Sequence, residues 1–196
     1  MADELGKDGL PIVRFDSREA YVGFLEREGA SAPGLWAKIA KKGSGESTAT
    51  YAELVDVSLR HGWIDSQVRR YDERFYVQRF TPRRPRSKWS RINRDSAERL
   101  IAAGEMRPGG LAEVERARAD GRWEAAYEPP STIEVPEDLR AALDAEPRAA
   151  ALFAELTKSN RYSILFRVHE AKRADTRARR ISNYVAMLAR GERPHA

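Results

Sequence analysis

Cysteine is absent from the chain, so there is no disulfide framework, no thiolate nucleophile and no cysteine-based metal site. Histidine is scarce: the 196 residues include only His61, His169 and His195. No two of them lie three or four residues apart, so no helix is predicted to present a pair of imidazoles to a metal ion. We therefore predict neither a metal nor a cofactor.

Long apolar runs are also missing. No stretch of 18 apolar residues occurs, and no membrane-spanning helix is predicted. The first residues, MADELGKDGLPIVRF, lack the basic region and the apolar region of a signal peptide. The sequence therefore predicts a cytoplasmic location.

Apolar residues make up only 41% of the chain and charged residues 33%. The apolar residues nevertheless recur at helical and strand spacing, which is typical of a folded protein rather than a disordered one. The length suits one domain, or one domain with an appended helical module.

Charge is unevenly distributed along the chain. The net charge of +5 conceals two basic blocks: residues 60–99 have 12 basic and 5 acidic side chains, and residues 158–196 have 10 and 3. Residues 100–157, between them, have 6 basic and 12 acidic side chains. The basic blocks either form a positive face for an anionic partner, a nucleic acid or an acidic protein, or are neutralised within the fold by the acidic block.

A small antiparallel sheet of about three strands is predicted near the middle of the chain. The first strand is Leu35–Ala40, after a Pro-Gly turn. Residues 63–71 (WIDSQVRRY) and 74–80 (RFYVQRF) flank the turn-like Asp72-Glu73, and the second of these runs has the period of a half-buried strand. These two runs are predicted to form a hairpin.

Helices are predicted around this sheet. After a frayed tail at residues 1–11, one helix begins at a cap formed by Asp16 or Ser17 and ends at Gly29. Thr50 is predicted to cap a second helix at residues 51–60. The predicted fold class is therefore α+β, a small antiparallel sheet backed by helices.

The stretch TPRRPRS, residues 81–87, contains two prolines and three arginines, and we call it the strap. Pro82 and Pro85 remove two backbone donors, so the strap is predicted to leave the sheet in an extended, stiff conformation. Ser87 is then predicted to cap a helix that ends at Gly104 and buries one apolar face: Trp89, Ile92, Leu100 and Ile101. A further helix is predicted to begin at Pro108, with Leu111 and Val114 pointing inward.

The last third of the chain is predicted to be helical. Residues 128–138 (EPPSTIEVPED) contain three prolines and form the best candidate for a linker. Helices are predicted at 137–145, at 147–157, from a cap at Ser159 to residue 173, and from Thr176 onward. The predicted organisation is an α+β domain at 12–127, the linker at 128–138 and an all-helical module at 139–191.

The loop KKGSGES, residues 41–47, superficially resembles a phosphate-binding loop. A true P-loop places its lysine after the glycines, at the start of a helix. Here Lys41 and Lys42 precede Gly43 and Gly45, and Glu46 would repel a phosphate. We interpret the segment as a plain loop.

Asp65 is the one weak catalytic candidate, because aspartate is disfavoured inside a strand. It is either a carboxylate in a cleft that acts as a general base or as an anionic partner for an arginine, or a structural partner of Arg79, Arg83 or another arginine that pins the strap to the sheet. The second alternative is favoured because no second catalytic group is identifiable. His61 is predicted to end a helix, where an imidazolium interacts well with the helix dipole, and Gly62 to terminate that helix.

Basic residues are the main binding candidates. Those near the sheet lie among aromatic residues, a composition expected of a nucleic-acid surface, although Phe75, Phe80 and Trp89 are better assigned to the core. A second group opens the last helix, where it opposes the helix dipole and requires partners, either Glu170 and Asp175 or an external anion. The candidates for anion or nucleic-acid binding are Arg69, Arg70, Arg79, Arg83, Arg84, Arg86, Lys88, Arg177, Arg179 and Arg180.

Two groups of residues form a recognisable pattern. The central group comprises Gly62, Trp63, Ile64, Asp65, Gln78, Arg79, Phe80, Thr81, Pro82, Arg83, Arg86, Ser87, Trp89, Ser90 and Asn93. The C-terminal group comprises Ala171-Lys172, Thr176-Arg177 and Arg179-Arg180-Ile181. Together they resemble the YdeI/OmpD-associated family, also labelled bacteriocin-protection proteins. The resemblance covers about residues 35–188, with one departure, Ser66 in place of a glycine that often follows the aspartate.

The resemblance implies a fold similar to the YjbR/CyaY-like group and no established reaction. A related group is often labelled DNA-binding. The first hypothesis is therefore a non-enzymatic cytoplasmic binding protein in stress or bacteriocin protection. Its functional face is predicted to be the strap arginines together with Arg79 and, on the preceding strand, Arg69 and Arg70. The second is sequence-tolerant nucleic-acid binding through that face, and the third is an enzyme with Asp65 in an arginine-lined pocket.

Overall fold

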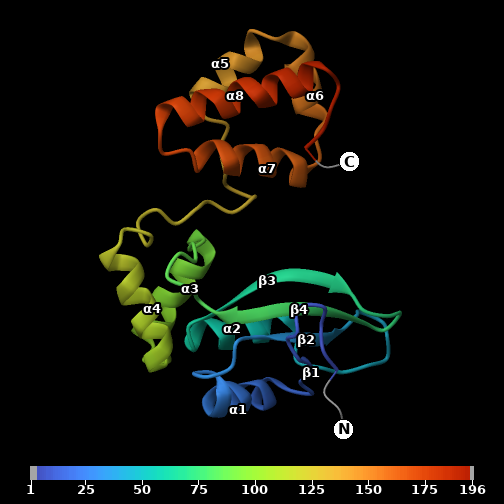
Figure 1. The fold of residues 1–196 in the computed structure, drawn as a ribbon, viewed down its shortest axis with the longest axis vertical. Helices are drawn as coiled ribbons and strands as arrows, with labels where there is room; N and C mark the ends of the chain where they lie inside the picture. Colours follow the sequence, from blue (N-terminus) through green and yellow to red (C-terminus); the bar gives the residue numbers. More distant parts are fainter. Residues whose placement is uncertain (1–3, 195–196) are drawn as a thin grey trace. The chain divides into compact units, whose positions relative to one another are not determined.

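A four-stranded sheet forms the centre of the first half of the chain (Figure 1). The computed structural model describes residues 4–194. The strand order is β1-β2-β4-β3, with β1 parallel to β2 and the other pairs antiparallel. The strands are β1 (Ile12–Arg14), β2 (Leu35–Ala40), β3 (Trp63–Arg70) and β4 (Phe75–Pro82).

The predicted α+β class is confirmed, but the prediction of about three antiparallel strands is wrong, because β1 makes the sheet four-stranded and mixed. At three residues, β1 is too short to show an alternating pattern in the sequence. Residues 4–11, before this strand, are also ordered, contrary to the tail predicted at 1–11, of which residues 1–3 lie outside the described range. Residues 5 and 11 form a β-bridge, and the Gly6 N–H donates to the Leu10 carbonyl at 2.8 Å.

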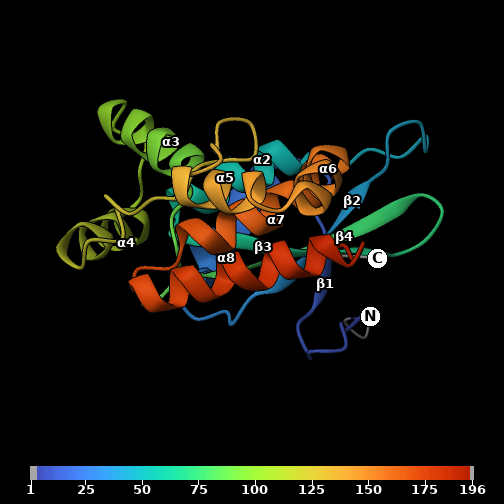
Figure 2. The same cartoon turned by 90° about the horizontal axis from the view of Figure 1, so that it is seen from above.

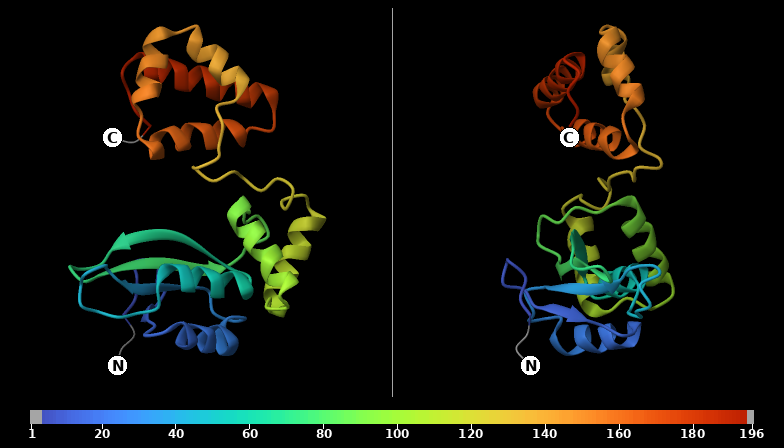
Figure 3. Two further views of the ribbon diagram at one scale, coloured as in Figure 1. Left: turned by 180° about the vertical axis from the view of Figure 1, so that it is seen from behind. Right: turned by 90° about the vertical axis from the view of Figure 1, so that its right-hand side faces the viewer.

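Helices α1 (Arg18–Glu28) and α2 (Tyr51–Arg60) cover one face of the sheet (Figures 1 and 3). Ser17 caps α1, and Thr50 forms a capping box with Glu53 at the start of α2, so both predicted starts are confirmed. The core between these helices and the sheet contains Tyr21, Leu25, Leu35, Ala37, Leu54, Val57, Trp63 and Phe80.

The β3–β4 hairpin and the loop after β2 project at the same end of the sheet (Figure 2). The hairpin confirms the predicted pairing of residues 63–71 with 74–80, with a bulge between Asp65 and Val68. Val68 lies on the edge strand and is 63% exposed. Every non-glycine residue in the described range has negative φ, so Ser66 adopts ordinary backbone geometry where a glycine was expected.

The strap differs from its predicted extended form. Strand β4 continues through Pro82, and the Ser87 N–H donates to the Arg84 carbonyl at 2.8 Å. Arg84-Pro85-Arg86-Ser87 is therefore a β-turn with proline at its second position, where the fixed φ of proline is favourable. Ser87 does not cap a helix, and its hydroxyl instead accepts from the Arg84 N–H at 2.9 Å.

Helices α3 (Arg91–Ala102) and α4 (Pro108–Ala119) pack around a second core built from Leu59, Trp89, Leu100, Val114 and Trp123. Pro108 begins α4 as predicted. Two residues predicted to point inward do not: Ile92 of α3 is 57% exposed and Leu111 of α4 is 38% exposed.

Two glycines let α4 approach α2 at backbone contact. A Cβ on Gly110 would lie 2.3 Å from the Arg60 carbonyl oxygen, and one on Gly109 would lie 2.9 Å from that of His61. The Arg107 N–H donates to the same Arg60 carbonyl at 3.0 Å. Gly62, with φ of 79°, turns the chain from α2 into β3, as predicted for a helix terminator.

The described chain divides into two compact units. One contains the elements above up to Trp89, together with Asn93–Ala126, and the other contains Ser90–Ile92 and the described residues from Tyr127 onward. The second unit is built from α5 (Glu137–Asp144), α6 (Pro147–Glu155), α7 (Lys158–His169) and α8 (Ala174–Ala189). Its core includes Leu139, Phe153, Ile164, Leu165, Val168 and Leu188.

The helical character of this unit is confirmed, but two predicted helix starts are wrong. Helix α7 is capped by Thr157, whose hydroxyl accepts from the Asn160 N–H at 3.3 Å, rather than by Ser159. It ends at His169 instead of residue 173. Helix α8 begins at Ala174 rather than Thr176.

Candidate anion-binding surfaces

The sheet face opposite α1 and α2 holds two of the predicted arginines, and both have partners within the fold. The guanidinium of Arg69 lies 4.5 Å from the centroid of the Trp36 ring. Arg79 Nε donates to Asp8 Oδ2 at 2.9 Å, and Trp36 Nε1 donates to Asp8 Oδ1 at 2.8 Å. The indole donor and then Arg79 hold the pKa of Asp8 below its ordinary value.

One further cation on this face, Lys38, lies over two aromatic rings. Lys38 Nζ is 3.9 Å from the centroid of Tyr71 and 4.8 Å from that of Phe75. Phe75 is buried, as are Phe80 and Trp89, which confirms their assignment to the core. Buried rings do not offer the stacking platform that single-stranded nucleic acids use.

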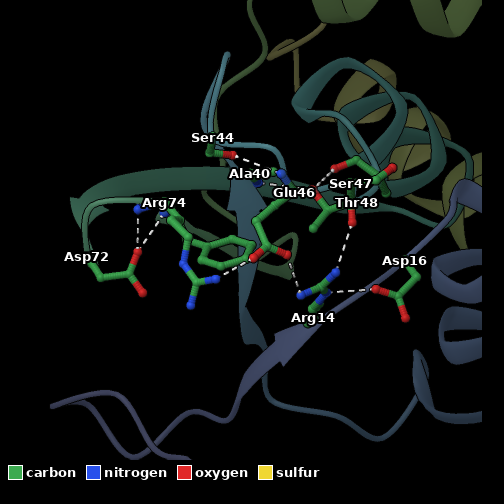
Figure 4. A network of polar contacts seen from close by, with 11 residues as sticks. Arg14, Asp16, Ala40, Ser44, Glu46, Ser47, Thr48, Asp72 and Arg74 are labelled. Atoms are coloured by element: carbon green, nitrogen blue, oxygen red, sulfur yellow. Dashed lines mark hydrogen bonds and ion pairs between the residues drawn. The ribbon is translucent and has the colours of Figure 1, made fainter.

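The loop after β2 is fixed by Glu46 (Figure 4). Its carboxylate accepts from Arg14 Nη1 at 3.1 Å and from Arg74 Nη1 at 2.7 Å. Arg14 also donates to Asp16 Oδ1 at 2.7 Å, and Asp72 Oδ1 accepts the backbone N–H of Arg74 at 2.7 Å. The loop is thus joined to β1 and to the hairpin turn by a carboxylate with two arginine partners.

Arg83 anchors the strap. Its side chain is buried, with the whole residue only 5% exposed, and its guanidinium lies 3.7 Å from the centroid of Trp89. Nη1 donates to the Lys88 carbonyl at 3.2 Å, and the Arg83 N–H donates to the Gly62 carbonyl at 2.9 Å. The sequence motif residues Gly62, Arg83 and Trp89 are therefore in one cluster.

Arg84 and Arg86 differ from Arg83. Both are exposed, and within residues 4–194 neither side chain has a hydrogen-bond or ion-pair partner. Their turn is held in place because Arg122 Nη1 donates to the Ser87 carbonyl at 2.7 Å. Lys88 is exposed but has an interaction partner, and Arg70 forms an ion pair with Glu73 at the surface.

Among the described residues Asp65 pairs with no arginine, so the structural pairing that we favoured is wrong. Asp65 Oδ2 instead accepts the Tyr51 hydroxyl at 2.7 Å, from the first turn of α2. Tyr51 is 43% exposed. A second titratable group therefore lies within hydrogen-bond reach, and the enzymatic hypothesis stays a prediction.

Two polar residues of the central motif are also placed. Gln78 is buried in β4, and Asn93, in α3, has an interaction partner.

His61 follows α2 as predicted. Its pKa is lowered from the ordinary value, mainly by burial and then by the charge of Arg107, while Glu26 acts in the opposite direction. This direction disfavours the imidazolium form, and the predicted imidazolium–dipole interaction stays a prediction. His169 Nε2 lies 2.9 Å from the Glu134 carbonyl, and His195 lies outside the described residues.

In α8, Arg177 and Arg180 have partners other than those predicted, whereas Arg179 interacts with the predicted Asp175. The pKa of Asp175 is lowered first by the hydrogen bond from Arg173 and also by the charge of Arg179. Arg177 forms a two-point pair with Asp138 and donates to the Val168 carbonyl at 2.9 Å. The hydrogen bonds from Arg177 are the main reason that the pKa of Asp138 lies below its ordinary value. Arg180 donates to the Arg167 carbonyl, and Arg179 is exposed.

Comparisons with known families divide the chain in a similar way. Residues 13–113, which are 101 of 196, match the family model described as a domain of unknown function (DUF8412), and the chain belongs to that family. Residues 132–191 match the model described as bacteriocin-protection, YdeI or OmpD-associated. Searches of curated proteins and of solved structures gave no match.

These matches confirm the YdeI/OmpD-associated resemblance for the C-terminal residues. The central motif from Gly62 to Asn93 falls in the range matched by the domain of unknown function, so the predicted extent of 35–188 is corrected to 132–191. The YjbR/CyaY-like assignment stays a prediction. Among the described helices, none has the length and apolar character needed to span a bilayer, and the described residues contain no group of three or more potential metal-ligating side chains.

Proposed function

We propose that the chain is a non-enzymatic binding protein that acts in the cytoplasm in bacteriocin protection or a related stress response, and that its strap contacts an acidic partner protein. The observation that carries this proposal is the contrast within the strap. Arg83 is buried against Trp89, whereas Arg84 and Arg86 project from a β-turn without partners in the described chain. The match of residues 132–191 supports the biological context.

A preformed turn favours binding because little conformational freedom of the backbone is lost when a partner is engaged. Arg84 and Arg86 flank Pro85, which limits the turn further. Guanidinium groups bind carboxylates through two parallel hydrogen bonds, so an acidic segment with closely spaced carboxylates matches this pair.

Poly-L-glutamate is a suitable probe for the full-length protein. The double variant Arg84→Ala/Arg86→Ala is expected to weaken binding by about tenfold or more, since two charge-assisted contacts are removed. The control is Arg27→Ala/Arg99→Ala, which removes the same charge from exposed positions on α1 and α3. Equal weakening by both double variants would contradict a specific strap site.

A cellular test uses the same variants. A strain lacking the protein is expected to become more sensitive to bacteriocin, and the wild-type protein and the Arg27/Arg99 variant are expected to restore protection. The Arg84/Arg86 variant is expected not to. Restored protection by that variant, at matched protein level, would contradict the proposal.

Nucleic-acid binding through the strap is the second candidate, and the exposed pair Arg84 and Arg86 is the observation that favours it. Two phosphate contacts predict that affinity falls only about tenfold between 50 and 200 mM salt, because the slope is close to −0.9 per contact. A six-contact site would lose about a thousandfold over the same range. Titration of a duplex oligonucleotide at both salt concentrations distinguishes these cases, and saturable binding of duplex but not of polyglutamate would favour this candidate over the first.

A further inference from the structure

A pocket of about 400 Å³ lies between α7 and α8 of the helical unit. This volume is within the range of sites for small molecules. The pocket lies in the segment that matches the YdeI/OmpD-associated model, and it does not involve the strap. It is lined by Ser159, Tyr162, Ser163, Phe166, Arg167, Glu170 and Arg180.

Helix α7 supplies two parallel rows of side chains to this pocket. Residues four positions apart lie on one face of a helix, one turn above another. Ser159, Ser163 and Arg167 form a polar row with this spacing, and Tyr162, Phe166 and Glu170 form the row beside it. Arg180 closes the pocket from α8.

The two arginines leave the pocket rich in hydrogen-bond donors. Arg180 donates through Nη1 to the Arg167 carbonyl, which places its guanidinium against α7. Arg167 is exposed, and within the described chain neither arginine forms an ion pair. A guanidinium has five N–H donors and no acceptor, so most donors of this pair remain available to a bound group.

The second row of α7 is aromatic at two of its three positions. Tyr162 and Phe166 have ring centroids 5.7 Å apart, and Tyr127 contacts Phe166 at 5.1 Å in an edge-on arrangement. The Tyr162 hydroxyl donates to the Glu128 carbonyl at 3.2 Å. Burial raises the pKa of Tyr162 to about 12, so this hydroxyl is neutral at physiological pH and does not repel an anion.

We propose that this pocket binds a small organic oxyanion, a phosphate or sulfate monoester with a planar ring, with the oxyanion at Arg167 and Arg180 and the ring against Phe166. Two guanidinium groups bind tetrahedral oxyanions through several charge-assisted hydrogen bonds. Glu170 is the one carboxylate of the lining and has an interaction of its own. Its charge opposes an anion, so Glu170→Gln is expected to tighten binding.

Phenyl phosphate is the probe, titrated into the full-length protein and followed by calorimetry and by amide chemical shifts of α7. Arg167→Ala is expected to weaken binding by about tenfold or more, which corresponds to losing one or two charged hydrogen bonds. Arg179→Ala is the matched control, because Arg179 is an exposed arginine of the same helix as Arg180 that does not line the pocket. It is expected to leave binding within about twofold.

Arg180 also braces α8 against α7, so its variants require a folding check by thermal melting. Arg180→Lys keeps the charge but loses the planar fork, and it is expected to bind phenyl phosphate more weakly while remaining folded.

Four outcomes would overturn the proposal: no saturable binding of phenyl phosphate, unchanged binding by Arg167→Ala, equal loss in Arg179→Ala, or phenol binding as tightly as phenyl phosphate. The first three exclude an arginine-based oxyanion site, and the fourth indicates an apolar one. The Arg84→Ala/Arg86→Ala variant is expected to bind phenyl phosphate normally, so failure of this proposal and failure of the strap proposal are distinguishable.

Discussion

The open face of the sheet and the strap are both rich in arginine, but their arginines have opposite surroundings. On the sheet, strand register places Arg79 opposite Trp36, Asp8 from the segment before β1 pairs with Arg79, and Arg69 lies over Trp36. In the strap, a β-turn exposes Arg84 and Arg86 while Arg83 is buried. Arginine density in a sequence therefore does not identify a binding face. Partners contributed by distant segments decide which guanidinium groups remain available.

Arg83→Ala tests the buried half of this comparison and should have the largest effect. The substitution removes a buried side chain and its contact with Trp89, and we expect the free energy of unfolding to fall by about 3 kcal/mol. Urea denaturation followed by tryptophan fluorescence measures the change. The matched control is Arg84→Ala, one residue away and exposed, for which a change of at most about 0.5 kcal/mol is expected. Similar losses in the two variants would remove the distinction between them.

Asp8→Asn tests the sheet face, where Arg79 is paired with a carboxylate of the same fold. The carboxylate accepts from Trp36 and Arg79, and its loss at neutral pH should reduce the free energy of unfolding by about 1 kcal/mol, a modest value because the site is partly exposed. The pKa of Asp8 is lower in the folded state than its ordinary value of 3.8. Its contribution is therefore present above pH 3.8 and is lost as the pH falls through the folded-state pKa.

The difference between wild type and Asp8→Asn should accordingly shrink in strongly acidic solution, as measured by urea denaturation across a pH series. Asp95→Asn, in the exposed pair with Arg94 on α3, is the comparison variant. A pH-independent difference for Asp8→Asn would show that the carboxylate charge is not the source of its effect.

Of these substitutions, Tyr51→Phe should reduce the free energy of unfolding least. It removes the hydroxyl that donates to Asp65, and an exposed hydrogen bond contributes about 0.5 kcal/mol to stability. Thermal unfolding of Tyr51→Phe and of Asp65→Asn measures how much each partner of this hydrogen bond contributes to stability. If Tyr51→Phe were as stable as wild type while Asp65→Asn lost several kcal/mol, Asp65 would have a structural role that its contact with Tyr51 does not explain.

Local features of the fold were predictable from the sequence. The capping box of Thr50 and Glu53, the strand period of residues 74–80 and the proline at the start of α4 each depend on residues close in the chain. The turn of the strap also had a local signal, because proline is favoured at the second position of a β-turn. The extended prediction gave too much weight to the two prolines taken together.

The candidate binding surfaces could not be predicted to the same extent, because the residues that pair with their arginines are far apart in sequence. Asp8 and Arg79 are separated by 71 residues, and Glu46 joins Arg14 and Arg74 across 32 and 28 residues. The burial of Arg83 opposes the usual exposure of arginine and depends on the Trp89 ring. The spacing of Ser159, Ser163 and Arg167 was present in the sequence, but only the packing of α8 against α7 brings Arg180 to it.

The junction of α2 and α4 restricts how the first unit can deform. Gly110 brings the backbone of α4 against the Arg60 carbonyl of α2, so a small displacement of α4 toward α2 meets backbone atoms rather than only the end of a flexible side chain. The contact therefore resists such a displacement. An alanine at position 110 would act as a wedge, because its methyl group has no space beside the Arg60 oxygen.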